Sequence, residues 1–141
     1  MQLVPYLYSA FVRYHLEGTP PFRALVIDYP DDPQTWALDS QYLAGESLLV
    51  APVVAGEHDR EVYLPAGEWF DFWTGVTLQG GRRLNVSGPL DQIPVFVKAG
   101  TLLPFAQPTL HTRRMPELLA SRCGPTGEAT FSARYMKTTG R

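Results

Sequence analysis

Residues 61–75 read EVYLPAGEWFDFWTG and are rich in aromatic residues. Pro65-Ala66-Gly67 breaks this stretch into two short runs of apolar and aromatic residues. Strand candidates of this kind, rich in β-branched or aromatic residues, lie within it and on both sides of it: 47–54, 61–64, 69–73, 83–86 and 94–98. Short strands with turn signals between them at regular spacing are typical of an antiparallel sandwich, so residues 46–107 are predicted to form a β-sandwich.

The residues before this sandwich follow a different pattern. Apolar residues at steps of three and four predict an amphipathic helix over 2–17, which Gly18 ends. The continuous apolar run 24–27 predicts a strand buried on both faces. An N-cap, a proline and a terminal glycine predict a second helix over 33–44. The order helix, strand, helix indicates an α/β segment, so we expect a domain boundary near residue 46.

The pattern weakens at the end of the chain. Residues 113–122 have a moderate helical tendency, and the last residues are polar and basic without a clear period. Residues 108–141 are therefore predicted to form a degenerate start of a further domain.

Composition excludes several classes of protein. The 141 residues carry a formal net charge of -2, which gives no field for collecting nucleic acid. One cysteine and three scattered histidines form no metal-ligand spacing. The apolar start is shorter than the ~20 residues that a membrane helix needs and lacks a basic leader, so we expect no transmembrane segment, no signal peptide and a cytoplasmic location.

The chemistry of glycoside hydrolysis needs two carboxylates that face each other across the sugar. Asp28, at the end of the predicted buried strand, is one candidate because α/β folds place ligands there. Asp31 and Asp32 precede a predicted helix, where capping explains them better than catalysis. No partner acid, nucleophile elbow, phosphate loop or zinc-binding helix is recognisable. We therefore predict no catalytic, cofactor-binding or metal-binding residue.

Aromatic residues alternate around Asp71. In a continuous strand Trp69 and Trp73 would share one face, about 13 Å apart, and the two phenylalanines would share the other. Such a face suits sugar stacking, although a core or domain interface explains it more simply.

The order of motifs in the chain resembles that of glycoside hydrolase family 31, the α-glucosidases and α-xylosidases. The motifs that carry the resemblance are PYLY (5–8), GTPPFRAL (18–25), TWALDSQYLAG (35–45), LLVAPV (48–53), VYLPAGEWFDFWTG (62–75) and PLDQIPVFVKAG (89–100). Together they span residues 3 to about 107.

The resemblance implies a retaining α-glycosidase that acts on α-linked oligosaccharides without a cofactor, with a (β/α)8 barrel followed by β-sandwich domains. Residues 1–45 would be the end of the barrel, 46–107 the proximal sandwich and 108–141 the start of a distal domain. Because the family's two catalytic aspartates precede the PYLY motif, we expect the chain to be a truncated scaffold that lacks them. The missing barrel would be supplied in cis or by a neighbouring chain.

The tail departs from the family's Leu-Tyr-Glu-Asp-Asp-Gly motif. Codons that encode Ala133 to Gly140, written GCG CGC TAT ATG AAG ACG ACG GGC, yield Ala-Leu-Tyr-Glu-Asp-Asp-Gly from the third base onward. We therefore hypothesise a frameshift near Ala133.

Two other functions are compatible with the sequence. The first is a free-standing carbohydrate-binding module that uses Trp69 and Trp73, which predicts glycan binding that is lost in Trp69→Ala. The second is an accessory chain that completes a split enzyme, which predicts a neighbouring reading frame that encodes the barrel.

Overall fold

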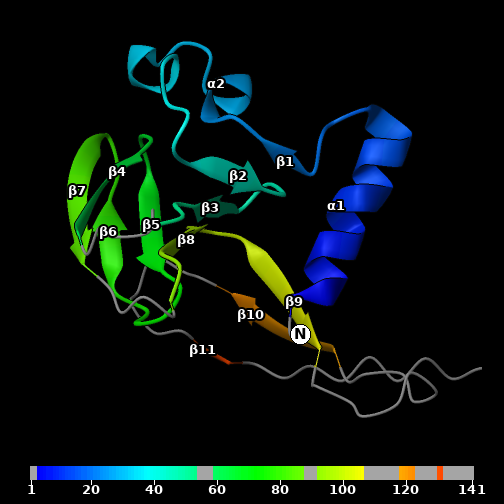
Figure 1. The fold of residues 1–141 in the computed structure, drawn as a ribbon. Coiled ribbons are helices and arrows are strands. Elements are labelled where there is room, and N and C mark those ends of the chain that lie inside the picture. Colours follow the sequence, from blue (N-terminus) through cyan, green and yellow to red (C-terminus); the bar gives the residue numbers. More distant parts are fainter. Residues whose placement is uncertain (1–2, 54–58, 88–91, 107–117, 123–129, 132–141) are drawn as a thin grey trace, which may run out of the picture.

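The computed structural model describes residues 3–53, 59–87, 92–106, 118–122 and 130–131 (Figure 1). Within these residues the fold is mainly β. The elements follow in the order α1 (Val4–Glu17), β1 (Phe22–Arg23), α2 (Leu25–Asp28), the 3-10 turn η1 (Pro33–Thr35), β2 (Tyr42–Ala44), β3 (Leu48–Val50), β4 (Asp59–Leu64), β5 (Glu68–Asp71), β6 (Thr77–Gln79), β7 (Arg82–Ser87), β8 (Val95–Lys98), β9 (Leu102–Ala106), β10 (Leu118–Arg122) and β11 (Thr130–Phe131).

The strands form antiparallel sheets. The largest sheet has the order β1-β2-β3-β8-β5-β6, and we call it the central sheet. Strands β4 and β7 pair over their whole length as a separate ribbon, and β9, β10 and β11 form a third sheet. The antiparallel strands within residues 46–107 agree with the predicted all-β character of that segment.

Both faces of the central sheet are covered by apolar residues. On the face toward β4 and β7, a buried cluster contains Leu25, Leu43, Leu49, Ala51, Val62, Leu64, Trp69 and Phe96. On the opposite face, toward α1 and β9, a second cluster contains Tyr6, Ala44, Leu48, Phe70, Val97 and Leu103. Neighbouring residues of each strand point to opposite faces, which explains why these strands are continuously apolar rather than alternating.

The predicted N-terminal helix is confirmed as α1. It ends at Gly18, whose left-handed conformation (φ 76°) lets its N–H donate to the carbonyl of Tyr14 at 2.9 Å. The Tyr6 hydroxyl fastens the helix to the turn between β2 and β3: it donates to the Ala44 carbonyl at 2.8 Å and accepts from the Ser47 N–H at 2.9 Å. The helix thereby lies along one side of the central sheet.

The predicted strand at 24–27 is wrong. Two residues, Phe22 and Arg23, pair with β2, and Leu25–Asp28 form a single helical turn. Leu25 is fully buried whereas Ile27 is exposed, so the run is not buried on both sides. A short apolar run has the same composition in a buried strand and in a helical turn, and its periodicity does not separate them.

The predicted helix at 33–44 is also wrong. The helical part stops after η1, and β2 pairs with β3 in the register Tyr42↔Val50. Gly45, which the sequence pattern treats as a helix stop, lies in the turn between these strands with φ 64°. Gln41 holds the chain extended here by donating to and accepting from the backbone of Tyr63, at 2.6 and 2.9 Å.

The strand predictions within 61–64 and 83–86 are confirmed by β4 and β7. The expected boundary near residue 46 falls in the turn between β2 and β3, so the central sheet draws strands from both predicted segments. Of the helical tendency expected at 113–122, residues 118–122 form strand β10 instead, and the rest lies outside the described residues, as does the hypothetical frameshift near Ala133.

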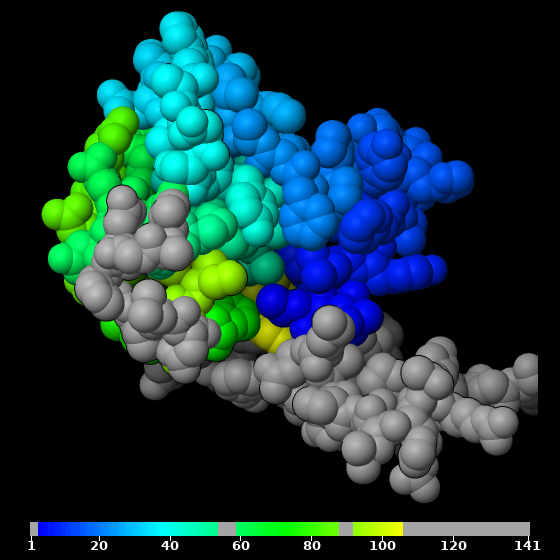
Figure 2. All heavy atoms as spheres, in the orientation of Figure 1, coloured from blue at the N-terminus to red at the C-terminus, as the bar shows by residue number. Residues whose placement is uncertain are grey.

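The space-filling view shows α1 as a ridge at one flank of the molecule, with one side free of other described atoms (Figure 2). In the described part of the chain, no helix has the length and apolarity needed to cross a membrane.

Candidate functional site

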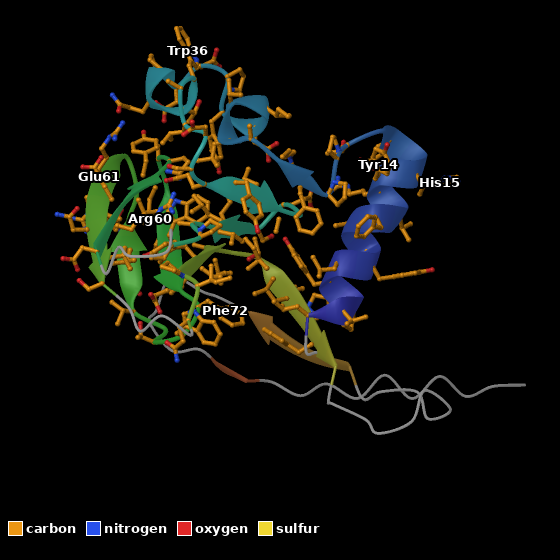
Figure 3. All side chains as sticks on the ribbon, in the orientation of Figure 1. Tyr14, His15, Trp36, Arg60, Glu61 and Phe72 are labelled. Carbon is orange, nitrogen blue, oxygen red and sulfur yellow. The ribbon has the colours of Figure 1, made fainter. Side chains whose placement is uncertain are left out.

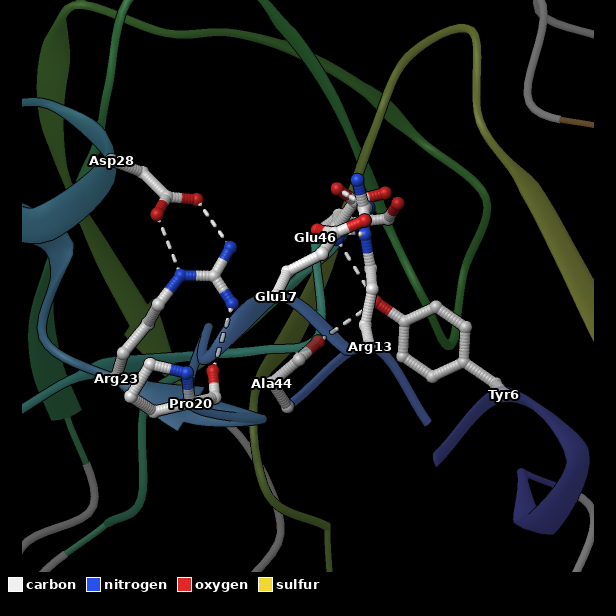
Figure 4. Close-up of polar contacts among 9 residues, drawn as sticks. Tyr6, Arg13, Glu17, Pro20, Arg23, Asp28, Ala44 and Glu46 are labelled. Carbon is white, nitrogen blue, oxygen red and sulfur yellow. Dashed lines mark hydrogen bonds and ion pairs between the residues drawn. The ribbon is translucent and has the colours of Figure 1, made fainter. Parts of the chain in front are cut away.

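Asp28, the first candidate acid, is bound to Arg23. Its two carboxylate oxygens accept from Nε and from a terminal nitrogen of the guanidinium, each at 2.6 Å (Figure 4). The Arg23 side chain is 5% exposed, and it also donates to the Pro20 carbonyl at 3.2 Å. The hydrogen bonds that the guanidinium donates to Asp28 raise the pKa of Arg23, which favours its charged form. The carboxylate therefore neutralises a buried cation.

Asp32 has the capping role that the sequence predicts. One carboxylate oxygen accepts from the Gln34 N–H at 3.0 Å at the start of η1, and the other accepts from the Tyr63 hydroxyl at 2.5 Å. Asp31, its neighbour, is exposed. Both carboxylate oxygens of Asp32 thus accept hydrogen bonds that hold the local structure.

Tyr63 joins the loop around η1 to strand β4. Burial, together with the hydrogen bond to Asp32, raises the pKa of its hydroxyl to about 12. Arg83 of β7 adds a second link, because it donates to Gln34 at 3.0 Å and to Glu61 at 2.5 Å. These polar contacts hold the loop against the β4–β7 ribbon.

The predicted shared face of Trp69 and Trp73 is wrong. Trp69 is 1% exposed, lies in the first core cluster and donates its indole N–H to the Pro65 carbonyl at 2.8 Å. Trp73 is 51% exposed and lies beyond the end of β5. The strand ends because the Asp71 carboxylate accepts from the N–H groups of Trp73 and Thr74, which turns the chain. A buried indole offers no stacking face, so the two tryptophans form no joint sugar platform.

Trp36, which the sequence analysis did not single out, is the most exposed tryptophan of the described residues at 64%. It lies after η1, at the end of the molecule opposite Phe72 (Figure 3). Its indole N–H donates to the Pro30 carbonyl at 2.8 Å, so the ring is held in one orientation. A single sequence does not reveal that Trp36 is exposed, because a buried tryptophan can have the same kinds of residues before and after it in the chain.

A pocket of about 300 Å³ lies between α1, the turn between β2 and β3, and β9. It is lined by Tyr6, Ser9, Ala10, Arg13, Gly45, Glu46, Ser47, Leu102 and Pro104. Arg13 forms ion pairs with Glu46 and, at 3.0 Å, with Glu17 (Figure 4). The Arg13 guanidinium at the pocket therefore contacts two carboxylates of the same chain, those of Glu17 and Glu46.

Two of the acids that the sequence offers as candidates thus accept hydrogen bonds from groups of this domain: Asp28 from Arg23, and Asp32 from Tyr63 and the Gln34 backbone. No group of three or more histidine, cysteine, aspartate or glutamate side chains converges anywhere in the described part of the chain. The described residues form a sheet with apolar clusters on both faces, buried side-chain hydrogen bonds, and a helix with exposed apolar side chains.

The sequence pattern of the glycosyl hydrolase family 31 C-terminal domain matches residues 18–103. The chain is 44% identical over 106 residues to an isomaltosyltransferase of Sporosarcina globispora, covering 74% of this chain and 10% of the relative. It is 44% identical over 107 residues to an α-xylosidase of Saccharolobus solfataricus, covering 74% of this chain and 14% of the relative.

Solved structures give the same relationship. A family 31 dextranase of Flavobacterium johnsoniae in complex with isomaltotriose superposes with a TM-score of 0.82 at 37% identity, covering 86% of this chain and 16% of that one. The cycloalternan-forming enzyme of Listeria monocytogenes, in complex with a pentasaccharide substrate, gives 0.83 at 34% identity, covering 88% and 13%. The chain thus spans roughly a tenth to a sixth of these relatives, and it belongs to glycoside hydrolase family 31, whose C-terminal domain it contains.

Proposed function

We propose that this chain provides the C-terminal β scaffold of a retaining α-glycosidase and supports the catalytic part without contributing a catalytic carboxylate. The observation that carries the proposal is the match of residues 18–103 to the family's C-terminal domain. The resemblance of the motifs puts both catalytic aspartates of the family ahead of this region.

The state of the candidate acids supports a scaffold role. Catalysis needs one acid that can release a proton and one carboxylate free to attack or stabilise the sugar. Asp28 is held by a buried guanidinium, and Asp32 accepts hydrogen bonds from Tyr63 and from the backbone. Both are already committed to contacts within the domain, which suits residues that maintain shape.

The substrate proposed for the whole enzyme is an α-linked oligosaccharide. The dextranase of Flavobacterium johnsoniae is seen with isomaltotriose and the Listeria monocytogenes enzyme with a pentasaccharide. The chemistry would take place in the part of such an enzyme that lies outside the 18–103 match. This chain contributes to it by holding that part in place.

The partner proposed is the (β/α)8 barrel of the family, joined in cis or supplied by a neighbouring chain. Residues 1–45 stay the proposed end of the barrel, although they adopt α1, β1, α2 and β2 rather than the predicted helix, strand and helix. Residues 46–107 stay the proposed proximal sandwich. Residues 108–141 stay the proposed start of a distal domain.

The nucleotide sequence around Ala133 tests the proposed frameshift. Codons that yield no acidic motif in another reading frame would refute it.

A chimeric enzyme tests the scaffold role. In the Saccharolobus solfataricus α-xylosidase, the residues aligned with Leu3–Ala106 are replaced by those of this chain. We expect a folded enzyme that hydrolyses 4-nitrophenyl α-xyloside, because the host supplies the catalytic acids. An insoluble or inactive chimera contradicts the proposal.

Single substitutions in the chimera separate scaffold from catalyst. Asp28→Asn is expected to lower the thermal midpoint while kcat at a permissive temperature changes by less than about threefold. Loss of a catalytic acid or base costs roughly 10²–10⁴-fold. A loss of that size at unchanged folding would assign Asp28 to the reaction and overturn the scaffold role.

A further inference from the structure

Trp36 presents an aromatic ring to solvent, and its polar group is already bonded within the chain. The side chain is 64% exposed, and its indole N–H donates to the Pro30 carbonyl at 2.8 Å. Because this N–H is the only polar group of the side chain, the surface that remains for a ligand is apolar. Figure 3 shows the ring beyond the ribbon, pointing away from the sheets. A ligand of Trp36 would therefore pack on the face of the ring.

The loop that carries Trp36 is held in place by hydrogen bonds. The neighbouring Thr35 is 1% exposed, and its hydroxyl lies 2.9 Å from the Tyr29 carbonyl, inside the loop. Side-chain hydrogen bonds of Asp32 and Gln34 tie the same loop to the β4–β7 ribbon. A ring on such a support is already oriented before a ligand arrives, and this pre-organisation lowers the entropic cost of binding.

The residues around Trp36 in the chain are polar, which favours a sugar over a protein as the ligand. Asp31, Gln34 and Asp39 are all exposed. A protein-binding surface offers a contiguous apolar patch of several side chains. One fixed aromatic ring among exposed carboxylate and amide groups instead suits a pyranose. The C–H groups of a pyranose pack on the negative face of the ring, and its hydroxyls form hydrogen bonds with polar side chains.

The charge near Trp36 favours a neutral sugar. Asp31 and Asp39 are acidic, and neither forms an ion pair with another described residue. Two free carboxylates repel phosphorylated and acidic sugars and leave neutral glycans as ligands. We propose that Trp36 is a stacking platform on the C-terminal domain for one glucose ring of a neutral α-glucan. The choice of an α-glucan rests on the proposed function, whose substrate is an α-linked oligosaccharide.

A titration of the purified full chain with isomaltotriose tests the proposal. The chain has three tryptophans, so a proton–nitrogen correlation spectrum contains three indole N–H peaks, each assigned by its loss in a substituted chain. We expect the Trp36 peak to shift and to saturate with a Kd of about 1–10 mM, because one stacked ring with a few hydrogen bonds binds weakly. The peak of Trp69, which is 1% exposed, should stay in place.

Trp73 is the matched control. It is 51% exposed, and its indole N–H also donates to a backbone carbonyl, that of Ile93 at 2.8 Å. Its ring already contacts Phe72, with centroids 5.1 Å apart. With the Kd taken from backbone N–H shifts, Trp36→Ala should weaken binding at least about tenfold and Trp73→Ala by less than about twofold. Trp36→Phe, which keeps an aromatic ring, should weaken binding less than Trp36→Ala.

Three results would overturn the proposal. The first is a Trp36 peak that does not shift, or that shifts equally with glycerol at the same concentration. The second is binding that survives Trp36→Ala. The third is a lower soluble yield of the α-xylosidase chimera in Trp36→Ala but not in Trp73→Ala, which would mean that the ring packs against the host protein. The proposed function fails separately, through an inactive unsubstituted chimera, whereas the titration uses this chain alone.

Discussion

The side chain of Tyr6 occupies the space that a Cβ atom on Gly45 would need. Helix α1 and the turn between β2 and β3 therefore approach more closely than any other residue at position 45 allows. The backbone of Gly45 adds a second requirement, because its φ of 64° lies in the left-handed region. The same contact carries the hydrogen bonds of Tyr6 to Ala44 and Ser47.

Gly45→Ala is therefore expected to lower the free energy of unfolding in two ways, by backbone strain and by displacing Tyr6. Gly75→Ala is the matched control, since Gly75 has φ 72° and open space around the position of a Cβ. The control should cost about 1 kcal/mol from strain. Gly45→Ala should cost about 1–3 kcal/mol more, from overpacking. Urea unfolding of the full chain measures both, and equal losses would mean that Tyr6 gives way freely.

Asp28→Asn is expected to destabilise the fold by about 3 kcal/mol, because it leaves the buried Arg23 guanidinium without its counter-charge. Asp31 follows shortly after Asp28 in the chain and is exposed, so the free energy of unfolding of Asp31→Asn should stay within about 0.5 kcal/mol of that of the unsubstituted protein. Denaturant unfolding at neutral pH gives both values. A small effect at Asp28 would show that water reaches Arg23.

Tyr63 predicts a loss of stability at alkaline pH. Its pKa is raised from 10 in the unfolded chain to about 12 in the folded one, so folding favours the neutral hydroxyl. The contribution is complete below pH 10 and is lost as the pH rises through 12, by about 3 kcal/mol in total. Burial also raises the pKa of Tyr6, which acts in the same direction.

Tyr63→Phe removes this titration and leaves that of Tyr6. The difference in unfolding free energy between pH 8 and pH 11.5 should therefore be smaller in Tyr63→Phe than in the unsubstituted protein. At pH 8 the variant should be less stable by about 1 kcal/mol, because Asp32 loses a hydrogen bond. Identical pH dependence in the two proteins would remove Tyr63 as its source.

The isolated full chain is expected to bind a hydrophobic dye such as anilinonaphthalene sulfonate, because α1 carries five apolar side chains that are 39–74% exposed: Val4, Tyr8, Phe11, Val12 and Leu16. Tyr8→Gln with Phe11→Gln and Leu16→Gln should lower the dye fluorescence by more than half. The control is Val76→Gln with Ile93→Gln and Leu102→Gln, three residues that are 50–63% exposed outside α1, and it should lower the fluorescence by less. A sharp cooperative melt without dye binding would contradict an exposed apolar face.

The sequence predicts the parts of this fold that depend on local signals. Helix α1 follows from its periodicity and from Gly18, and strands β4 and β7 follow from β-branched runs set between turns. Asp32 is confirmed as a cap because its role needs only the next two residues. Such features depend on neighbours in the chain.

The features that sequence reasoning misses depend on distant residues. Strand β2 forms because Gln41 bonds the backbone of Tyr63, 22 residues away, and the helical signals around it are weaker than that pairing. Trp69 and Trp73 do not share a strand face, because the Asp71 side chain turns the chain and ends β5 between them. The sequence predicts an apolar stripe on α1 that includes Val4 and Phe11, but in the structure both side chains are about half exposed, because the helix packs through Tyr6 and Ala10 instead.

If the catalytic acids of the proposed glycosidase lie outside this chain, the purified full chain has no glycosidase activity of its own. Incubated at high concentration with 4-nitrophenyl α-glucoside and α-xyloside, the chain should release no nitrophenol above the buffer rate. Release that rises in proportion to the amount of this chain, and that disappears in Asp28→Asn or Asp32→Asn, would show that the chain itself supplies catalytic acids.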